Sequence, residues 1–130
     1  MSKSDYLETE LLEWCTGQAN ALGTAATPWL ALFTTAPTDA GGGTEVTGGS
    51  YARHNSSGKW AAVSGGSVAT NAECLFPTAT ANWGTVVAAG LFDASSSGNL
   101  LRWATLSVSR TVLSGDTFRF AAGAVTFTED

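Results

Sequence analysis

The spacing of apolar residues changes near residue 28, and it predicts a helix before that point and strands after it. In the N-terminal segment, apolar side chains recur at three- and four-residue steps, which places them on one face of a helix. The residues on this face are Leu7, Leu11, Cys15 and Leu22, with Trp14 and Ala19 alongside. Asp5 and Glu8 have the spacing of a capping box, and Gly23 is suited to end a helix. The sequence therefore predicts a helix over residues 4–23.

Short apolar runs separated by turn-forming residues follow, and they predict strands. The first run, "WLALF", begins directly after a proline, and the last two, "TFRFA" and "VTFTE", alternate with a period of two. Several short strands at this spacing are typical of an antiparallel β-sandwich or a jelly-roll-like barrel. We therefore expect a mainly β fold over residues 28–130, preceded by one α-helix. The predicted core positions are Leu11, Leu30, Leu32, Leu91, Phe92, Leu106, Phe118, Phe120 and Phe127.

Length and composition refine this expectation. A chain of 130 residues fits a single domain, spanning 1–130, with a core of its own. Only 13% of the residues are charged, which is about half the usual share in soluble proteins. Much of the surface must therefore be Ser, Thr, Gly and Ala. Such a surface favours coverage by another chain, because isolated domains rely on charge to stay dispersed.

The distribution of charge argues against two classes of partner. The net charge is −5 and the six basic residues are scattered, whereas nucleic-acid binding needs a concentrated basic face. No apolar run approaches the roughly 20 residues that span a membrane, and the N-terminus has acids where a signal peptide is apolar. The sequence predicts no nucleic-acid partner, no membrane partner, and synthesis without secretion by the general route.

The two cysteines lie in different local settings. Cys15 belongs to the helical pattern, and Cys74 lies in an apolar stretch before "FPTAT". A disulfide between them is one alternative, but two buried free thiols are the favoured interpretation. Neither has the spacing of a redox or zinc motif.

Five glycines interrupt the segment over residues 37–50, "PTDAGGGTEVTGGS". No Gly-Lys-Ser/Thr follows, as a phosphate-binding loop requires, and no crossover helix follows, as a dinucleotide fingerprint requires. Asp39 and Glu45 are possible calcium ligands, but a dedicated site carries a denser set of acids. Because both flanks read as strands, we expect an ordered or partner-ordered strand connection.

The sequence contains few residues in patterns that indicate catalysis. His54 is the only histidine, so a Ser-His-Asp arrangement would have to use it, and no GxSxG nucleophile motif accompanies it. The sequence thus predicts no catalytic residue, no cofactor, no metal site and no enzymatic activity. Trp60 and Trp83 are flanked by turn formers, which suits an interface as well as a core. The candidate partner-contact residues are Gly41, Gly42, Gly43, Glu45, Tyr51, Arg53, His54, Trp60 and Trp83.

Three long stretches of the chain resemble a known family. These are "PWLALFTTAPTDAGGGTEVTGGSYAR", "FPTATANWGTVVAAGLFDASSSGNLL" and "SVSRTVLSGDTFRFAAGAVTFTED". Together they are similar to short virion proteins of tailed bacteriophages, which are often labelled tail fibre proteins. Small β-rich proteins that resemble them decorate capsids. The resemblance implies a virion protein that is made in the cytoplasm of a host, and it offers no catalytic residues.

Two virion functions are compatible with this resemblance. A capsid decoration, or cement, protein would bind the major capsid protein on the outer capsid surface as a homo-oligomer, possibly a trimer, and stabilise the shell by mass action. A tail fibre protein would instead attach to tail proteins and contact a polymer on the host surface. Chain length favours decoration, because 130 residues leave no shaft once the domain is built.

Overall fold

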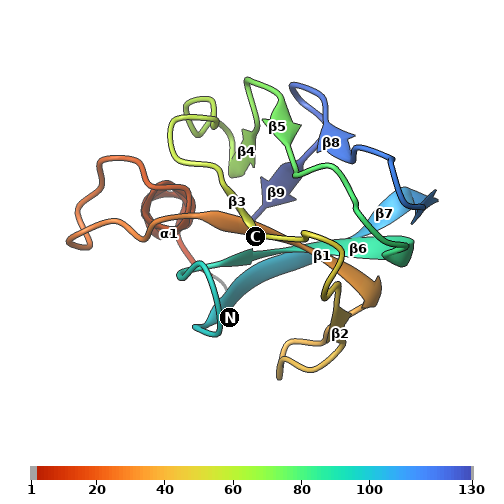
Figure 1. Cartoon of the computed structure of the whole chain (residues 1–130). Coiled ribbons are helices and arrows are strands. Elements are labelled where there is room, and N and C mark those ends of the chain that lie inside the picture. Colours follow the sequence, from red (N-terminus) through yellow and green to blue (C-terminus); the bar gives the residue numbers. More distant parts are fainter. Residues whose placement is uncertain (1–2, 130) are drawn as a thin grey trace.

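The structure is a computed structural model that describes residues 3–129, and its elements are mainly strands (Figure 1). In order they are α1 (Asp5–Cys15), β1 (Trp29–Thr35), β2 (Thr44–Glu45), β3 (His54–Asn55), β4 (Ser67–Ala69), β5 (Cys74–Leu75), β6 (Gly84–Phe92), β7 (Leu100–Val112), β8 (Arg119–Phe120) and β9 (Thr126–Thr128). Every strand pairing is antiparallel. The predicted mainly β, antiparallel fold with one N-terminal helix is confirmed. Across residues 3–129 the strands form no closed barrel.

The largest sheet has the order β2-β1-β6-β7, and β3 also pairs with β1. Strands β1 and β6 lie inside this sheet, and both carry runs of consecutive buried residues. Such a run forms where a strand is covered on both faces. Accordingly, Leu30 and Leu32 belong to the main core, whereas Ala31 and Phe33 form a smaller cluster on the opposite face.

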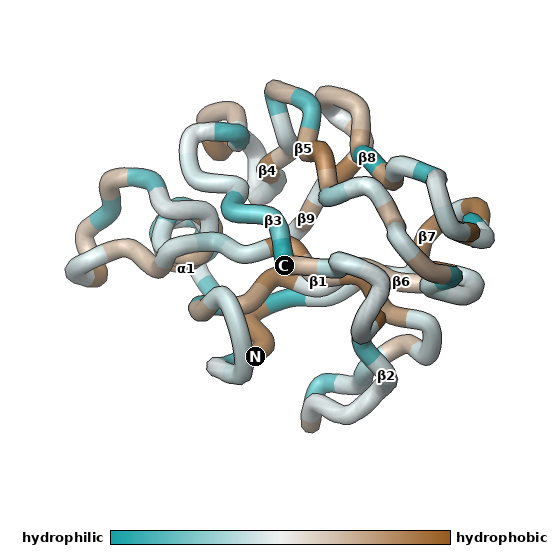
Figure 2. The backbone as a smooth tube through the Cα atoms, in the orientation of Figure 1, coloured by the Kyte–Doolittle hydropathy of each residue, from teal (hydrophilic) through white to brown (hydrophobic). Residues whose placement is uncertain are grey.

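Two small sheets, β4–β9 and β5–β8, lie over one face of the large sheet (Figure 1). The main core lies between these layers. Phe76 is at its centre, with its ring 5.8 Å from Phe118 and 6.1 Å from Phe120 in edge-to-face geometry. Figure 2 shows apolar stretches on strands of both layers, while pale, weakly polar residues dominate the connections. The long connections are thus rich in Ser, Thr and Gly, which accounts for the small share of charged residues in the sequence.

The predicted core positions agree with the structure for the most part. Six are buried, namely Leu30, Leu32, Leu91, Phe118, Phe120 and Phe127. Leu11, Phe92 and Leu106 are only half-buried. Phe92 lies on the outer face of the large sheet, under the side chain of Arg53, and Leu106 lies on an edge strand.

The helix is shorter than predicted, since it ends at Cys15 and not near residue 23. The reason is a nearer glycine, Gly17, which has φ +76° and the position expected for a C-terminal helix glycine. The buried face of α1 consists of Glu8, Leu12 and Cys15, so the predicted face was wrong by one residue at Leu11. Leu22 is 47% exposed in the segment after the helix.

Cys15 and Cys74 are both buried and free, as the favoured interpretation held. The Cys15 thiol connects α1 to the large sheet, because its Sγ accepts a hydrogen bond of 3.2 Å from Nε of Arg102 on β7. Burial raises the pKa of this thiol above its ordinary value. Arg102 also forms an ion pair with Glu129, so the N-terminal helix, β7 and the C-terminal segment meet at this point.

Candidate functional site

Three of the predicted contact residues, Glu45, Tyr51 and Arg53, come together at one corner of the large sheet. The Arg53 guanidinium donates to both carboxylate oxygens of Glu45, from Nε to Oε2 at 2.9 Å and from Nη2 to Oε1 at 2.8 Å. The Tyr51 hydroxyl donates to Glu45 Oε2 at 2.7 Å and accepts from the backbone N–H of Leu32 at 3.0 Å. Two parallel charge-assisted bonds make this a strong, directional pair.

The same guanidinium also binds a second loop. Arg53 Nη1 donates to the carbonyls of Ala94 at 2.9 Å and Ser97 at 2.8 Å, and its Cζ lies 3.7 Å from the centre of the Phe92 ring. The side chain of Arg53 is only 7% exposed. We call Glu45, Tyr51, Arg53 and Phe92 the Arg53 cluster. All three nitrogens of the guanidinium donate within the chain, and these bonds fix the loop after β6 against the segment around β2.

Electrostatics in the Arg53 cluster favour the charged arginine and the neutral phenol. The hydrogen bonds to Glu45 raise the pKa of Arg53 above its ordinary value. Burial, with the carboxylate of Glu45 nearby, raises the pKa of the Tyr51 phenol well above its usual range. The phenol therefore stays protonated and keeps donating to Glu45. This arrangement holds loops in place and presents no free nucleophile or base.

The glycine-rich connection is ordered by its own backbone. Thr38 and Gly41 exchange two hydrogen bonds, 2.9 Å and 2.8 Å between N and O, and β2 then pairs with β1. Gly41, Gly42 and Gly43 all have positive φ, of 92°, 78° and 72°. A side chain on Gly43 would lie 2.7 Å from the carbonyl oxygen of Thr35, whereas Gly41 and Gly42 face open space. The third glycine thus permits the close return of the chain to β1.

Trp60 and Trp83 are buried, which corrects the expectation that they contribute to a contact surface. They are 6% and 5% exposed. Each indole N–H is satisfied inside the chain, since Trp60 Nε1 donates to Ser56 Oγ at 3.0 Å and Trp83 Nε1 donates to the Gly49 carbonyl at 2.9 Å. Both rings therefore belong to the main core and not to a contact surface.

His54 lies on β3 and belongs to no catalytic arrangement among the described residues. Its Nδ1 is 3.1 Å from the carbonyl oxygen of Leu75, its ring packs near Phe76, and its Nε2 is buried without a hydrogen-bond partner in the described chain. Burial lowers the pKa of His54 below its ordinary value. The imidazole is therefore neutral at pH 7, with Nδ1–H as donor to Leu75.

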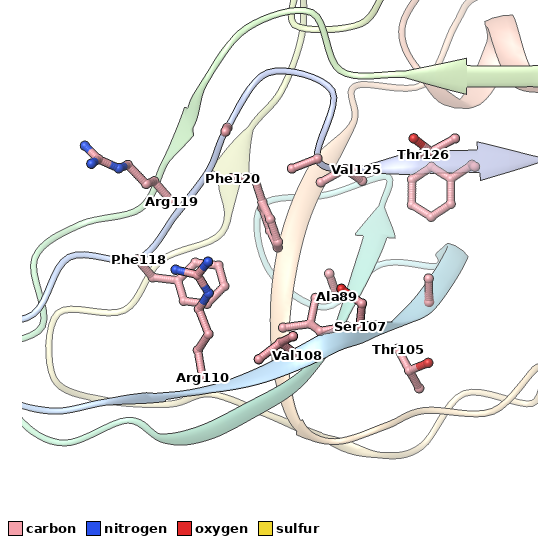
Figure 3. A pocket seen from close by; sticks show the side chains of 15 residues that line it. Ala89, Thr105, Ser107, Val108, Arg110, Phe118, Arg119, Phe120, Val125 and Thr126 are labelled. Carbon is pink, nitrogen blue, oxygen red and sulfur yellow. The ribbon is translucent and has the colours of Figure 1, made fainter.

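Sequence reasoning missed a groove along β7. It has a volume of about 640 Å³ and is lined by residues 104–108 and 110 from β7, by Ala89, and by residues 118–121 and 124–127 from the C-terminal segment (Figure 3). A second hollow of about 310 Å³ shares Ala104, Thr126 and Phe127 with the first and extends to Asp39 and Trp103. We call the two together the β7 groove.

The chemistry of the β7 groove differs between its ends. Arg110 and Arg119 line one end, and Figure 3 shows Arg110 rising from β7 beside Phe118. At the other end, Asp39 Oδ1 accepts a hydrogen bond of 3.0 Å from Trp103 Nε1. Between them the walls are apolar or carry hydroxyls, as at Thr105, Ser107 and Thr126. The groove suits an uncharged or self-complementary surface.

Residues 3–129 contain no group of three or more His, Cys, Asp or Glu side chains placed to hold a metal ion. In the same part of the chain, no helix has the length and hydropathy needed to cross a bilayer.

The fold and the site define a β-rich protein whose polar side chains fix its own loops and whose open feature is a groove at a sheet edge. A comparison with known families makes this class specific. Residues 2–128 match the model of the family described as podophage GP4 fiber I protein gp80, and the chain belongs to this family. The resemblance to tail fibre and virion proteins of tailed bacteriophages is thereby confirmed, and membership implies a virion protein. No curated protein matches the chain.

Proposed function

We propose that this protein is a structural component of a podophage tail fibre and that it acts by binding, without catalysing a reaction. The observation that carries this proposal is the match to a fibre protein family over residues 2–128, which covers nearly the whole chain. The description of that family favours the fibre alternative over capsid decoration, although chain length alone had favoured decoration. The partners of a fibre component are other tail proteins and a polymer on the host surface.

The structure supports a binding function by the way its polar groups are used. In the most polar corner, the Arg53 cluster, all three guanidinium nitrogens of Arg53 donate hydrogen bonds within the chain. The β7 groove, by contrast, is lined mostly by apolar and hydroxyl-bearing side chains and is open. Interfaces in assemblies have this composition, with charge depleted at the centre and retained at the rim.

Localisation in intact virions tests the proposal directly. Antibodies raised against the purified chain, coupled to gold, are expected to label the tail in electron micrographs of virions. Virions whose copy of the gene is disrupted serve as the control for non-specific labelling. Gold confined to the outer capsid surface would overturn the fibre proposal and favour a decoration protein bound to the major capsid protein.

The absence of enzymatic activity has its own test. Purified protein and the His54→Ala variant are incubated with polymer extracted from the host surface, and the release of reducing ends is measured. We expect no release from either protein. Release by the wild type that disappears in His54→Ala would show that the chain is an enzyme.

A further inference from the structure

One edge of the large sheet is long and unpaired. Strand β7 spans Leu100–Val112 and, within residues 3–129, pairs with β6 only, so the other row of its backbone N–H and C=O groups faces the β7 groove. Strands β8 and β9 line the groove opposite but pair with β5 and β4. Unpaired edges of this length invite association with another chain unless charge, proline or distortion prevents it.

Of these three protections, the middle of this edge has only distortion, in the form of a bulge. The stretch from Ala104 to Ser109, "ATLSVS", has no charged residue and no proline. The ladder with β6 is interrupted there, because the pairing Ala88↔Thr105 is followed by Val86↔Arg110, leaving one residue of β6 opposite four of β7. This wide bulge carries Val108, which is 71% exposed. An apolar side chain therefore protrudes at the rim of an apolar groove.

The charges at the two ends of the groove are opposite. Asp39 lies at the Trp103 end, where Arg102 also lines the hollow but is paired with Glu129, while Arg110 and Arg119 lie at the other end. Arg110 has no ion pair within residues 3–129, and Arg119 has only a long contact of 3.9 Å with Glu73. A twofold rotation about the middle of β7 exchanges the two ends, so it brings Asp39 of one copy toward Arg110 of another.

We propose that two copies of this chain associate through their β7 edges, antiparallel about a twofold axis near Leu106–Ser107. Val108 of each copy enters the groove of the other, and Arg110 of each faces Asp39 of the other. Because of the bulge at the axis, the two β7 strands can form backbone hydrogen bonds only on either side of it. Apolar contacts therefore supply most of the binding energy, and the charges at the two ends set the relative orientation of the two copies. Docking of a different protein and binding of an acidic polymer are the competing uses of the same edge.

The molar mass of the purified full chain tests this pairing. Sedimentation velocity over a range of protein concentrations is expected to show a monomer–dimer equilibrium for the wild type. Asp39→Arg and Arg110→Asp are each expected to weaken the dimer by about tenfold or more, because each places two like-charge contacts in the interface. The double variant Asp39→Arg/Arg110→Asp restores opposite charges and is expected to recover most of the affinity.

A matched control separates pairing from general charge effects. Glu13→Arg, on α1 and outside the residues that line the groove, makes the same change of charge as Asp39→Arg and is expected to leave the dimer unchanged. Circular dichroism melting curves confirm that every variant is folded. A wild type that remains a monomer at all concentrations, a trimer, or a dimer whose affinity neither single variant weakens would overturn the proposal. The result is independent of the proposed function, because it does not depend on where the protein lies in the virion.

Discussion

The Arg53 cluster and the β7 groove lie at the two edges of the large sheet, and these edges differ in how far other parts of the chain cover them. At the first edge, β2 and β3 both cover β1, and Arg53 binds Glu45 and two carbonyls of a distant loop. At the second edge, no strand of the described residues lies beyond β7. One edge is closed by polar groups of the same chain, and the other is left open.

The difference between the two edges shows what the few charged residues of this sequence contact. Each residue of the Glu45–Arg53 pair contributes more by fixing loops than it would as an exposed surface charge. Arg110, of the same residue type, is exposed on β7 and has no such pair in the described chain. Side-chain contacts, and not residue type, therefore decide which arginine stabilises the monomer and which remains free for a partner.

Removing the two arginines in turn is the strongest test of this comparison. Arg53→Ala is expected to lower the free energy of unfolding by about 3 kcal/mol, because it leaves the half-buried Glu45 carboxylate and two carbonyls without their donor. Arg110→Ala is expected to change it by less than about 0.5 kcal/mol, as is usual for an exposed side chain without specific contacts. Urea unfolding followed by tryptophan fluorescence measures both, at a protein concentration where association does not contribute. Equal effects of the two substitutions would remove the distinction between the edges.

Two neighbouring glycines test how tightly the closed edge is built. Gly42→Ala and Gly43→Ala introduce the same methyl group at similar φ, +78° and +72°, and each carries a conformational cost of about 1 kcal/mol. Only the methyl at position 43 meets backbone, 2.7 Å from the Thr35 oxygen. We expect Gly43→Ala to lower the free energy of unfolding by about 1–2 kcal/mol more than Gly42→Ala, in the same urea experiment. Similar losses would mean that the loop relaxes away from β1 without cost.

The sequence predicted the kinds of elements well, because periodicity records which residues face the core. The alternation in "TFRFA" and "VTFTE" correctly placed Phe118, Phe120 and Phe127 in the interior. The sequence indicated the exact end of the helix less clearly. Gly17 and Gly23 both have positive φ and both suit a helix end, and apolar spacing alone did not show that the first of them ends α1.

The arrangement of strands could not be read from the sequence, and the site depends on it. Glu45 and Arg53 were candidates by residue type, but their pairing arises because β2 and β3 both lie beside β1. For Trp60 and Trp83 the sequence left interface and core open, because turn residues beside an indole do not say whether the ring points in or out. The β7 groove was missed for the same reason, since an open edge is a property of strand order.

His54, the neighbour of Arg53, is expected to make the stability of the closed edge depend on pH. Burial lowers its pKa in the folded protein, so the unfolded chain, with a pKa of about 6.5, binds a proton more readily. The stability from neutral His54 is therefore complete above about pH 6.5 and is lost as the pH falls toward the folded pKa. The wild type is expected to lose more stability than His54→Gln between about pH 7.5 and 5.5, measured by urea midpoints at each pH. Parallel losses in the two proteins would show that His54 is not the group responsible.

The smallest effect on the monomer is expected at the open edge, where Val108 is 71% exposed. Val108→Asp at low protein concentration should change the free energy of unfolding by no more than about 0.5 kcal/mol, because little apolar surface of the monomer is lost from burial. Val86→Asp on the adjoining β6 is the matched control, since Val86 is fully buried and the same change is expected to prevent folding or cost several kcal/mol. A large loss of monomer stability in Val108→Asp would mean that the bulge packs within its own chain, and the edge would then be closed like the other. If Val108→Asp kept the stability of the monomer but abolished the dimer, the result would instead mean that a second copy buries Val108.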